Sequence, residues 1–202
     1  MNYLAHLYFA SDSPDSMVGN LLPDFTKTLS HETYSLEVLK GIALHRFIDH
    51  YTDQHPIVKE SKTRISKERR RFSAILIDIF YDHFLAKHWE QYAKSTLRES
   101  THCYYQQLPL STVLLPKRLE EAIVRMPQID LLYNYQSLKG MEHAVNRLSQ
   151  RIRFENNLHG GIVELEENYL ELEKDFHHYF KALQIAVDIY RSPSLESLSQ
   201  SS

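Results

Sequence analysis

The sequence predicts an all-α protein, and three observations support that class. Apolar residues recur with the three-to-four-residue spacing of helices along almost the whole chain. The period-two alternation that marks strands is hard to find between turn residues. The chain has only 5 glycines, and it contains neither G-x-G-x-x-G nor a P-loop, which excludes nucleotide cradles of those kinds. With 202 residues, we expect one helical domain over residues 1–191.

The first half of the chain predicts five helices, over residues 2–10, 14–22, 35–54, 57–68 and 70–92. Ser13 and Pro14 have the residue types of a helix cap and of the first helical position. Asp24 follows the second helix at the entry to a loop. A residue before proline is pushed out of the helical region, so His55, which precedes Pro56, ends the third helix.

The second half predicts four more helices, over residues 95–107, 116–126, 138–154 and 162–190. Pro109 and Pro127 follow the ends of the first two, where proline is common. The serine-rich residues 192–202 are expected to form a frayed tail.

Composition narrows the class of protein further. No apolar run is long enough to cross a bilayer, and the apolar start of the chain lacks the basic region of a secretory signal. Cys103 is the only cysteine, which rules out an internal disulfide and fits a reducing compartment. We therefore expect a soluble, cytoplasmic protein that does not bind membranes.

The net charge of −3 hides two oppositely charged segments. Residues 59–71 contain seven basic and two acidic side chains, whereas residues 164–175 contain one basic and six acidic side chains. A basic run is ordinarily a solvated face, but Lys67, Arg69, Arg70 and Arg71 also suit an acidic protein partner. Because no recognition motif accompanies the run and the whole chain is acidic, nucleic acid is not the expected partner.

Asp78 and Asp82 lie four residues apart in one of the most apolar stretches of the chain. On a helix this spacing puts both carboxylates on one face beside Ile75, while Ser73 and His83 fall on the opposite face. An ionised carboxylate out of water costs several kcal/mol unless a cation or strong donors meet it, and two in one place repel each other. A metal ion is the simplest partner for both.

His45 and Asp49 repeat this spacing on the helix over residues 35–54. An imidazole and a carboxylate one turn apart can place a nitrogen and an oxygen near one cation. A single pair of this kind is more often a structural hydrogen bond than a ligand pair. Two pairs turned toward apolar neighbours favour a metal site, because four polar groups would otherwise have to pair inside one core.

Four further residues are candidates for this site. Asp24 and His6 are expected to join it from outside the two helices, Asp53 is either a supporting group or an exposed helix end, and Arg46 is a candidate phosphate clamp. Oxygen and nitrogen ligands without thiolate favour Mn²⁺, with Mg²⁺ or Fe²⁺ as alternatives. Such cations suit phosphate ester hydrolysis, because they acidify water and screen phosphoryl charge.

Four motifs, in their order and spacing, resemble the acyl carrier protein phosphodiesterases, also called holo-acyl-carrier-protein hydrolases: residues 1–7, 19–25, 41–53 and 78–89. The resemblance implies an all-α fold distantly similar to HD-domain phosphohydrolases. It also implies a Mn²⁺-dependent diesterase that removes 4′-phosphopantetheine from the serine of holo-acyl carrier protein. The implied metal-binding and catalytic positions are Asp24, His45, Asp49, Asp78 and Asp82, with His6 and Asp53 as further candidates.

The resemblance gives the basic run a natural partner, because the carrier protein is strongly acidic. The sequence departs from the wider HD pattern in one respect, because it contains no His-Asp dipeptide. Two alternative functions stay open. The first is an HD-like phosphohydrolase of a small nucleotide, and the second is a non-catalytic helical adaptor that binds an acidic protein through residues 59–71.

Overall fold

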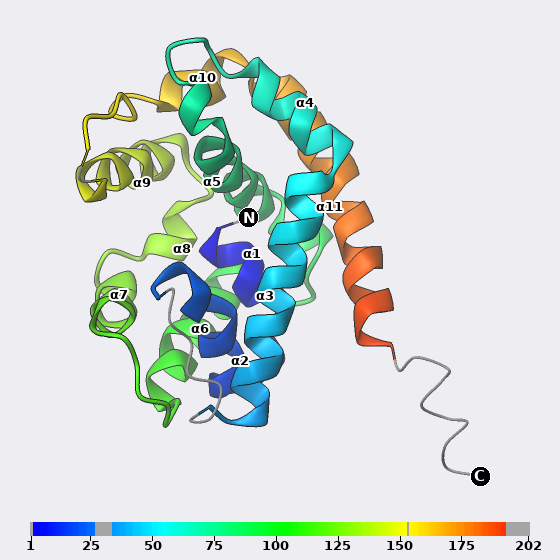
Figure 1. The fold of residues 1–202 in the computed structure, drawn as a ribbon, viewed down its shortest axis with the longest axis vertical. Helices are drawn as coiled ribbons and strands as arrows, with labels where there is room; N and C mark the ends of the chain where they lie inside the picture. Colours follow the sequence, from blue (N-terminus) through cyan, green and yellow to red (C-terminus); the bar gives the residue numbers. More distant parts are fainter. Residues whose placement is uncertain (1, 27–33, 153, 193–202) are drawn as a thin grey trace.

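The computed structural model describes residues 2–26, 34–152 and 154–192, and these residues contain helices and no strand, which confirms the all-α class (Figure 1). The helices are α1 (Tyr3–Tyr8), α2 (Pro14–Leu21), α3 (Leu36–Gln54), α4 (Pro56–Arg64), α5 (Ser73–Lys87), α6 (Leu97–Gln107), α7 (Lys117–Gln128), α8 (Leu131–Asn134), α9 (Leu138–Arg151), α10 (Ile162–Glu167) and α11 (Tyr169–Arg191). Short 3₁₀ turns are η1 (Leu22–Asp24), η2 (Arg70–Phe72), η3 (Trp89–Gln91) and η4 (Leu108–Leu110). Apart from Ser192, the expected tail lies outside the described residues. A search of the described helices finds none with the length and apolar character to span a membrane.

Most helix ends agree with the sequence prediction to within a few residues. Ser13 caps α2 by accepting a hydrogen bond from the backbone N–H of Ser16 at 3.1 Å, and His55 separates α3 from α4. The single helix predicted over residues 162–190 is wrong, because Asn168 divides it into α10 and α11. The four-residue helix α8 was not predicted, since so short a segment carries no measurable periodicity.

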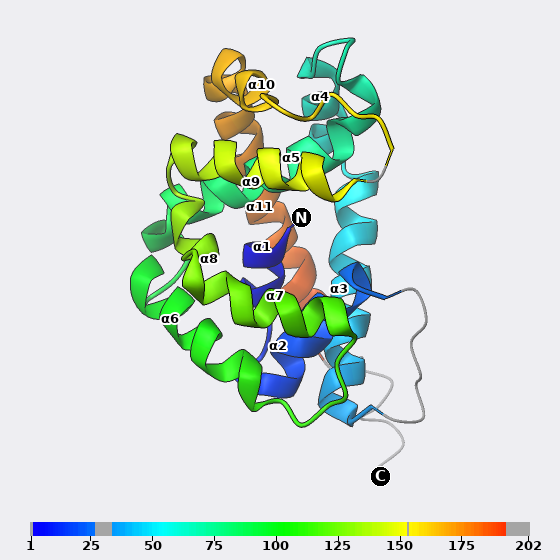
Figure 2. The same cartoon turned by 90° about the vertical axis from the view of Figure 1, so that its left-hand side faces the viewer.

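The helices surround α1, whose inner residues are fully buried (Figure 1). Helices α3 and α11 run along one side of the molecule, and α7, α8 and α9 lie on the other. Figure 2 shows this second side, with α9 above α7 and the start of α1 visible between them. Helix α5 crosses the interior, where Phe84 meets Phe176 of α11 with ring centroids 5.9 Å apart.

Two glycines allow α2 and α3 to pack against each other at backbone contact. A Cβ atom on Gly19 would lie 2.3 Å from the carbonyl oxygen of Val38, and one on Gly41 would lie 2.6 Å from that of Ser16. Any larger residue would force the helices apart, because packed interiors leave no room for an added methyl group. This contact fixes the position of α3, which carries His45 and Asp49.

Asp82 holds the N-terminus of α1 against α5. Its Oδ2 accepts the backbone N–H of Leu4 at 2.7 Å, and its Oδ1 accepts those of Asn2 and Ala5, each at 3.3 Å. Asn2, the cap residue of α1, makes no side-chain cap hydrogen bond of its own. A carboxylate satisfies the free N–H groups of a helix start and is favoured there by the helix dipole. Asp82 therefore serves as the cap of α1 from a distant part of the chain.

The predicted division of α5 into an inner and an outer face is wrong. Ser73 and His83, expected on the outer face, are buried, whereas Ile75, expected to point inward, is 38% exposed. Only Asp82 of the carboxylate pair is fully buried, and Asp78 is half-buried. The reason is that α5 is covered on nearly all sides by other helices, so its apolar residues do not mark one inner face.

The two charged segments noted in the sequence pair with each other across α4, α11 and their flanking turns. Arg64 Nε donates to Asp175 Oδ2 at 2.9 Å, and Arg69 Nη1 donates to Glu164 Oε1 at 3.1 Å. Both carboxylates are almost entirely removed from solvent. Two of the seven basic side chains in residues 59–71 therefore pair with the acidic segment, while Lys59, Lys67, Arg70 and Arg71 are exposed.

Asp82→Ala is expected to lower the free energy of unfolding by about 2 kcal/mol or more, because it leaves buried N–H groups of α1 without an acceptor. The measurement is urea unfolding at pH 8, which lies above the pKa of about 7 to which burial raises Asp82. Asp82→Asn keeps a carbonyl acceptor and should lose less. Equal stability of all three proteins would contradict the capping role.

His83→Gln is expected to change how stability depends on pH. His83 Nδ1 donates to the carbonyl of Tyr135 and Nε2 accepts from the hydroxyl of Tyr169, and burial lowers the pKa of the ring to about 4. Between pH 6.5 and 4 the unfolded chain takes up a proton that the folded protein refuses, so wild-type stability falls as pH falls through that window.

The free energy of unfolding of the wild type, relative to the His83→Gln variant, should therefore drop by about 1–2 kcal/mol between pH 7 and pH 5. Chemical denaturation of both proteins across that range gives the difference directly, and other titrating groups cancel in the comparison. A difference that stays constant with pH would show that His83 titrates normally in the folded protein.

Candidate metal centre

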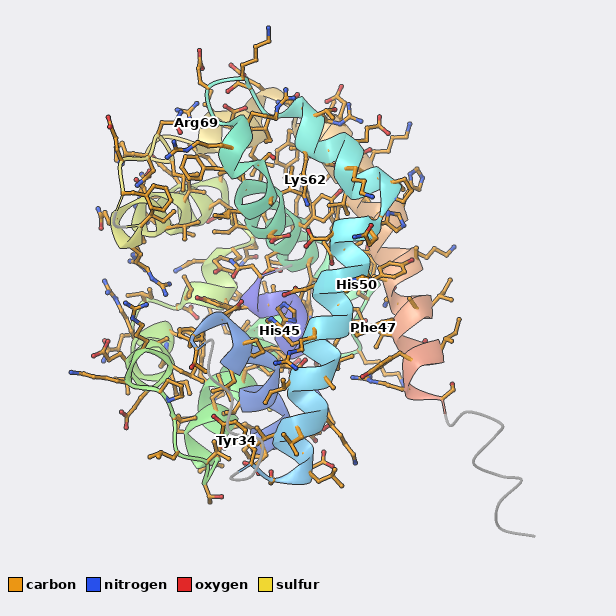
Figure 3. All side chains as sticks on the ribbon, viewed as in Figure 1. Tyr34, His45, Phe47, His50, Lys62 and Arg69 are labelled. Carbon is orange, nitrogen blue, oxygen red and sulfur yellow. The ribbon has the colours of Figure 1, made fainter. Side chains whose placement is uncertain are left out.

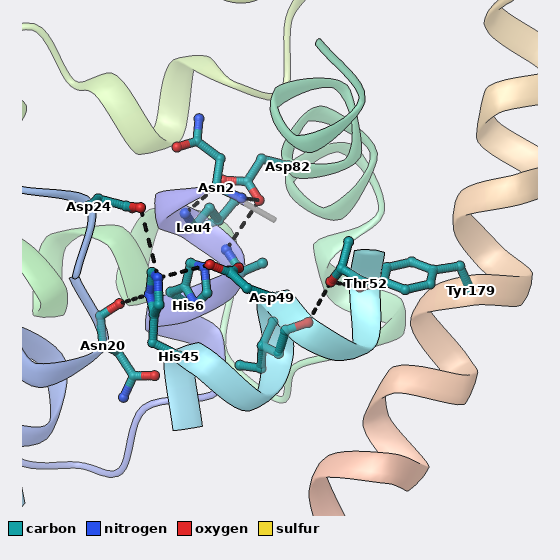
Figure 4. Close-up of polar contacts among 12 residues, drawn as sticks. Asn2, Leu4, His6, Asn20, Asp24, His45, Asp49, Thr52, Asp82 and Tyr179 are labelled. Carbon is teal, nitrogen blue, oxygen red and sulfur yellow. Dashed lines mark hydrogen bonds and ion pairs between the residues drawn. The ribbon is translucent and has the colours of Figure 1, made fainter. Parts of the chain in front are cut away.

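Four of the predicted site residues converge where α1, η1 and α3 meet (Figure 4). His45 Nε2 lies 3.0 Å from Asp49 Oδ2 and 3.8 Å from Asp24 Oδ1. His6 Nε2 lies 3.2 Å from Asp49 Oδ1, and the two imidazole rings stack with centroids 3.9 Å apart. Ligand atoms of His6, His45 and Asp49 all lie within 4.8 Å of one another. We call these four residues the histidine–aspartate cluster.

The cluster has a buried and an open side. The rings of His6 and His45 are almost completely removed from solvent, whereas the side chains of Asp24 and Asp49 are 34% and 42% exposed. Figure 3 shows His45 on the side of α3 that faces α1, with Phe47 and His50 on the side toward α11. The histidines thus form the floor of the cluster and the carboxylates form its rim.

The ring of His45 is oriented by the backbone of α2. Its Nδ1 lies 2.7 Å from the carbonyl oxygen of Asn20, which can only accept a hydrogen bond, so Nδ1 carries the proton. The remaining nitrogen, Nε2, is directed at Asp49 and Asp24. A backbone carbonyl that fixes the tautomer in this way is the usual support of a metal-binding histidine.

His6 has no such support. Although Nε2 is near Asp49, the geometry is not that of a hydrogen bond, and neither ring nitrogen has a hydrogen-bond partner within the described residues. A buried polar atom without a partner is costly and rare. The cap that Asp82 supplies to α1 is what keeps this ring in place beside His45.

The two imidazoles of the cluster differ in their electrostatics. Burial lowers the pKa of His6 to about 3, so this ring is neutral at physiological pH. Burial would also lower the pKa of His45, but its contacts with Asp49 and Asp24 raise it above the usual value. Burial would raise the pKa of Asp49, yet the two rings hold it well below its usual range.

Asp24 is the carboxylate whose ionised form is disfavoured. Burial raises its pKa to about 6, and the charges of Asp49 and Asp78 add to the rise. Neighbouring carboxylates raise one another's pKa, because two like charges repel, and the His45 ring acts in the opposite direction on Asp24. The cluster therefore combines the neutral ring of His6 with the ring of His45 and the carboxylates of Asp24 and Asp49.

This donor set fits a divalent cation. Neutral imidazoles and carboxylates without thiolate are ligands for Mn²⁺, Fe²⁺ or Zn²⁺, and binding requires the histidines to be deprotonated. His6 meets that requirement, and its buried nitrogens make no hydrogen bond within the described residues, although Nε2 lies 3.2 Å from Asp49 Oδ1. His6 and Asp24, proposed from the sequence as additions from outside the two helices, do lie beside His45 and Asp49.

The other predicted site residues lie elsewhere. Asp82 caps α1 with both of its oxygens, and Asp53 pairs with Lys62 at 3.0 Å on the surface. Asp78 lines a cleft together with Asp24 instead of standing within the cluster. Arg46 is exposed on α3. The apolar surroundings of Asp82 in the sequence indicated that it is buried. They could not show whether its carboxylate binds a metal ion or caps a helix.

The predicted partner-binding run lies at a distance from the cluster, since Figure 3 shows Arg69 at the far end of the molecule from His45. The arginines of this run donate hydrogen bonds to other groups of the protein. Arg69 donates to the carbonyl of Asn157 as well as to Glu164, and Arg70 donates to the carbonyls of Ile65 and Thr63. Arg71 donates to the carbonyl of Glu155, and Lys67 is exposed.

A second cluster of potential ligands contains His88, Glu173 and His177. Lys87 Nζ already contacts Glu173 Oε1 at 2.8 Å, and His88 Nε2 contacts the same oxygen at 2.6 Å. The carboxylate of this second cluster is thus already paired with Lys87 and His88.

Sequence reasoning missed the arginines that line the cleft beside the cluster. Arg118 and Arg125 on α7 and Arg147 and Arg151 on α9 face this cleft together with Asp24 and Asp78. Their spacing, seven residues on one helix and four on the other, places each pair on one helical face. That spacing was readable from the sequence, but their meeting across a cleft was not.

A family model and individual relatives place the chain in the same protein family. A family model described as acyl carrier protein phosphodiesterase matches residues 1–183. Proteins with that name from Pectobacterium atrosepticum, Serratia proteamaculans and Yersinia pestis are 31%, 33% and 32% identical to this chain. The alignments cover 92%, 89% and 91% of this chain and 97%, 94% and 95% of the relatives. No solved structure matches the chain.

Proposed function

Because the chain belongs to the acyl carrier protein phosphodiesterase family, we propose that it is a metal-dependent hydrolase that removes 4′-phosphopantetheine from holo-acyl carrier protein. The relatives are named for an enzyme and for its protein substrate. The observation that carries the metal dependence is the buried, unpartnered ring of His6 beside His45 and Asp49. The reducing cytoplasm, where a chain with a single cysteine is suited to act, is the proposed location.

The proposed ligands are His6, His45 and Asp49, with Asp24 as a further oxygen donor on the side that faces the cleft. Mn²⁺ is the proposed ion. When bound, such an ion acts as a Lewis acid on a phosphoryl oxygen and lowers the pKa of water. A cation would also remove the crowding of Asp24 by Asp49 and Asp78 that raises its pKa.

The residues of the chain supply position and charge. The backbone carbonyl of Asn20 holds the His45 ring with Nε2 toward the rim, and the capped helix α1 holds His6 in the floor. The rim carboxylates, Asp24 and Asp49, are the parts of the cluster that a protein-bound substrate can reach. In the proposed reaction, water adds to phosphorus, and the bond from phosphorus to the serine oxygen of the carrier breaks. The serine regains its hydroxyl, and phosphopantetheine leaves as the monoester.

Asp49→Asn is expected to abolish Mn²⁺ binding, because it removes the carboxylate that lies between both histidines. Metal content after dialysis, together with the rise in melting temperature on adding Mn²⁺, measures the effect. The matched control is Asp53→Asn, one turn further along α3, which removes an exposed carboxylate paired with Lys62 and should bind Mn²⁺ like the wild type. Equal metal binding by the Asp49 and Asp53 variants would exclude the proposed ligand set.

Incubation of the wild type with Mn²⁺ and holo-acyl carrier protein is expected to yield apo carrier, seen by mass spectrometry as the loss of the prosthetic group. A chelator and the Asp49→Asn substitution should each reduce the rate by at least about a hundredfold, since metal-assisted hydrolysis loses its ion. A carrier that stays intact while a nucleotide is cleaved would support the nucleotide hydrolase. A carrier that is bound but not cleaved, with no uptake of Mn²⁺, would support the adaptor.

A further inference from the structure

A cleft of about 910 Å³ opens between α7 and α9 on the side of the molecule shown in Figure 2. Its floor includes Ile79 of α5 and Met126 of α7, and one end reaches Asp24 and Asp78. Asp24 is also 3.8 Å from His45, so the cleft leads to the open side of the histidine–aspartate cluster. The described residues thus connect the candidate metal centre to one large surface depression.

Four arginines border this cleft, two from each helix: Arg118, Arg125, Arg147 and Arg151. Within the described ranges, Arg118, Arg125 and Arg147 make no hydrogen bond or ion pair, and Arg151 contacts only the hydroxyl of Tyr3 at 3.4 Å. Glu121, the acidic residue of α7 on the same cleft, lies 4.0 Å from Lys117. The cleft is thus lined by four arginines and three carboxylates, and three of the arginines make no direct contact with a carboxylate among the described residues.

The basic run at residues 67–71 offers a contrast. Arg69, Arg70 and Arg71 donate hydrogen bonds to carbonyls or carboxylates of the protein. A guanidinium group that already donates hydrogen bonds within the protein gains little by contacting another molecule. A guanidinium group without such bonds can form a new ion pair when an acidic molecule binds. The charge available for binding an acidic molecule lies at the cleft, although the denser basic sequence lies elsewhere.

We propose that the cleft between α7 and α9 is the surface on which the acidic carrier protein docks, with Arg118 and Arg125 on one border and Arg147 and Arg151 on the other. This inference rests on the proposed function and adds the mode of substrate recognition. Docking there would bring the modified serine of the carrier toward Asp24, at the end of the cleft that adjoins the cluster.

The spacing of the arginines favours a protein over a small anion. Arg118 and Arg125 are seven residues apart on α7, which corresponds to about 10 Å along the helix axis. A single phosphate is bound by side chains that converge on one point. Two borders of positive charge that extend along helices instead match acidic residues spread over the surface of a folded partner.

The test is the double variant Arg118→Glu/Arg125→Glu, measured against the matched control Lys94→Glu/Lys181→Glu. All four residues are exposed, and the control makes the same change in net charge outside the cleft. Binding of holo-acyl carrier protein to the metal-free protein is followed by fluorescence anisotropy at low salt, and hydrolysis is followed with Mn²⁺. We expect the cleft variant to raise Kd and KM by about tenfold or more, with a smaller effect on kcat, and the control to change neither by more than about twofold.

The outcomes separate this inference from the proposed function. If the wild type hydrolyses the carrier and the cleft variant has an unchanged KM, the docking surface is excluded while the proposed function stands. If the wild type binds the carrier through the arginines without hydrolysing it, the docking surface stands and the hydrolase is excluded. Cleft arginines that bind ATP, with no affinity for the carrier, would overturn the inference, as would a control variant that loses binding equally.

Discussion

The contact between the Asp82 carboxylate and the first N–H groups of α1 is the interaction on which the candidate site depends. Helix α1 is only 6 residues long, too short to be stable on its own, and its own cap residue provides no side-chain acceptor. Asp82 supplies that acceptor from the middle of α5. By fixing α1, it fixes the ring of His6 against His45. A residue that the sequence suggested as a ligand thus contributes by stabilising the helix that carries His6, one of the proposed ligands.

A second constraint acts from the opposite side. Gly19 and Gly41 let α2 and α3 touch at the backbone, and this proximity brings the carbonyl of Asn20 within 2.7 Å of His45 Nδ1. The two constraints place Nε2 of His6 and Nε2 of His45 at 3.2 and 3.0 Å from the oxygens of Asp49. Because Nδ1 of His45 donates to the carbonyl of Asn20, the neutral form of this ring would turn a lone pair toward the carboxylate, which a proton or a cation on Nε2 avoids. The cluster is built to hold a positive charge.

The distribution of charge over the rest of the molecule separates structural from available arginines. Arg64 and Arg69 are committed to Asp175 and Glu164, and these pairs hold α4 and the following turn against α10 and α11. Among the described residues, the arginines of α7 and α9 make no such ion pairs. They border the cleft that is also lined by Asp24. Partner recognition is therefore better inferred from which charges lack partners than from where charges are dense in sequence.

The sequence alone determined the all-α class, most helix boundaries and the pairing of His45 with Asp49, because each follows from local periodicity, proline placement or one-turn spacing. It also pointed to Asp24 and His6 as neighbours of that pair through motif resemblance. Tertiary structure decided the role of Asp82, the pairing of Arg64 and Arg69 with Asp175 and Glu164, and the cleft between α7 and α9. Those features join residues that are tens of positions apart or more, and no local pattern records which distant side chains meet. Periodicity also failed for α5, because a helix covered on nearly all sides has no single apolar face.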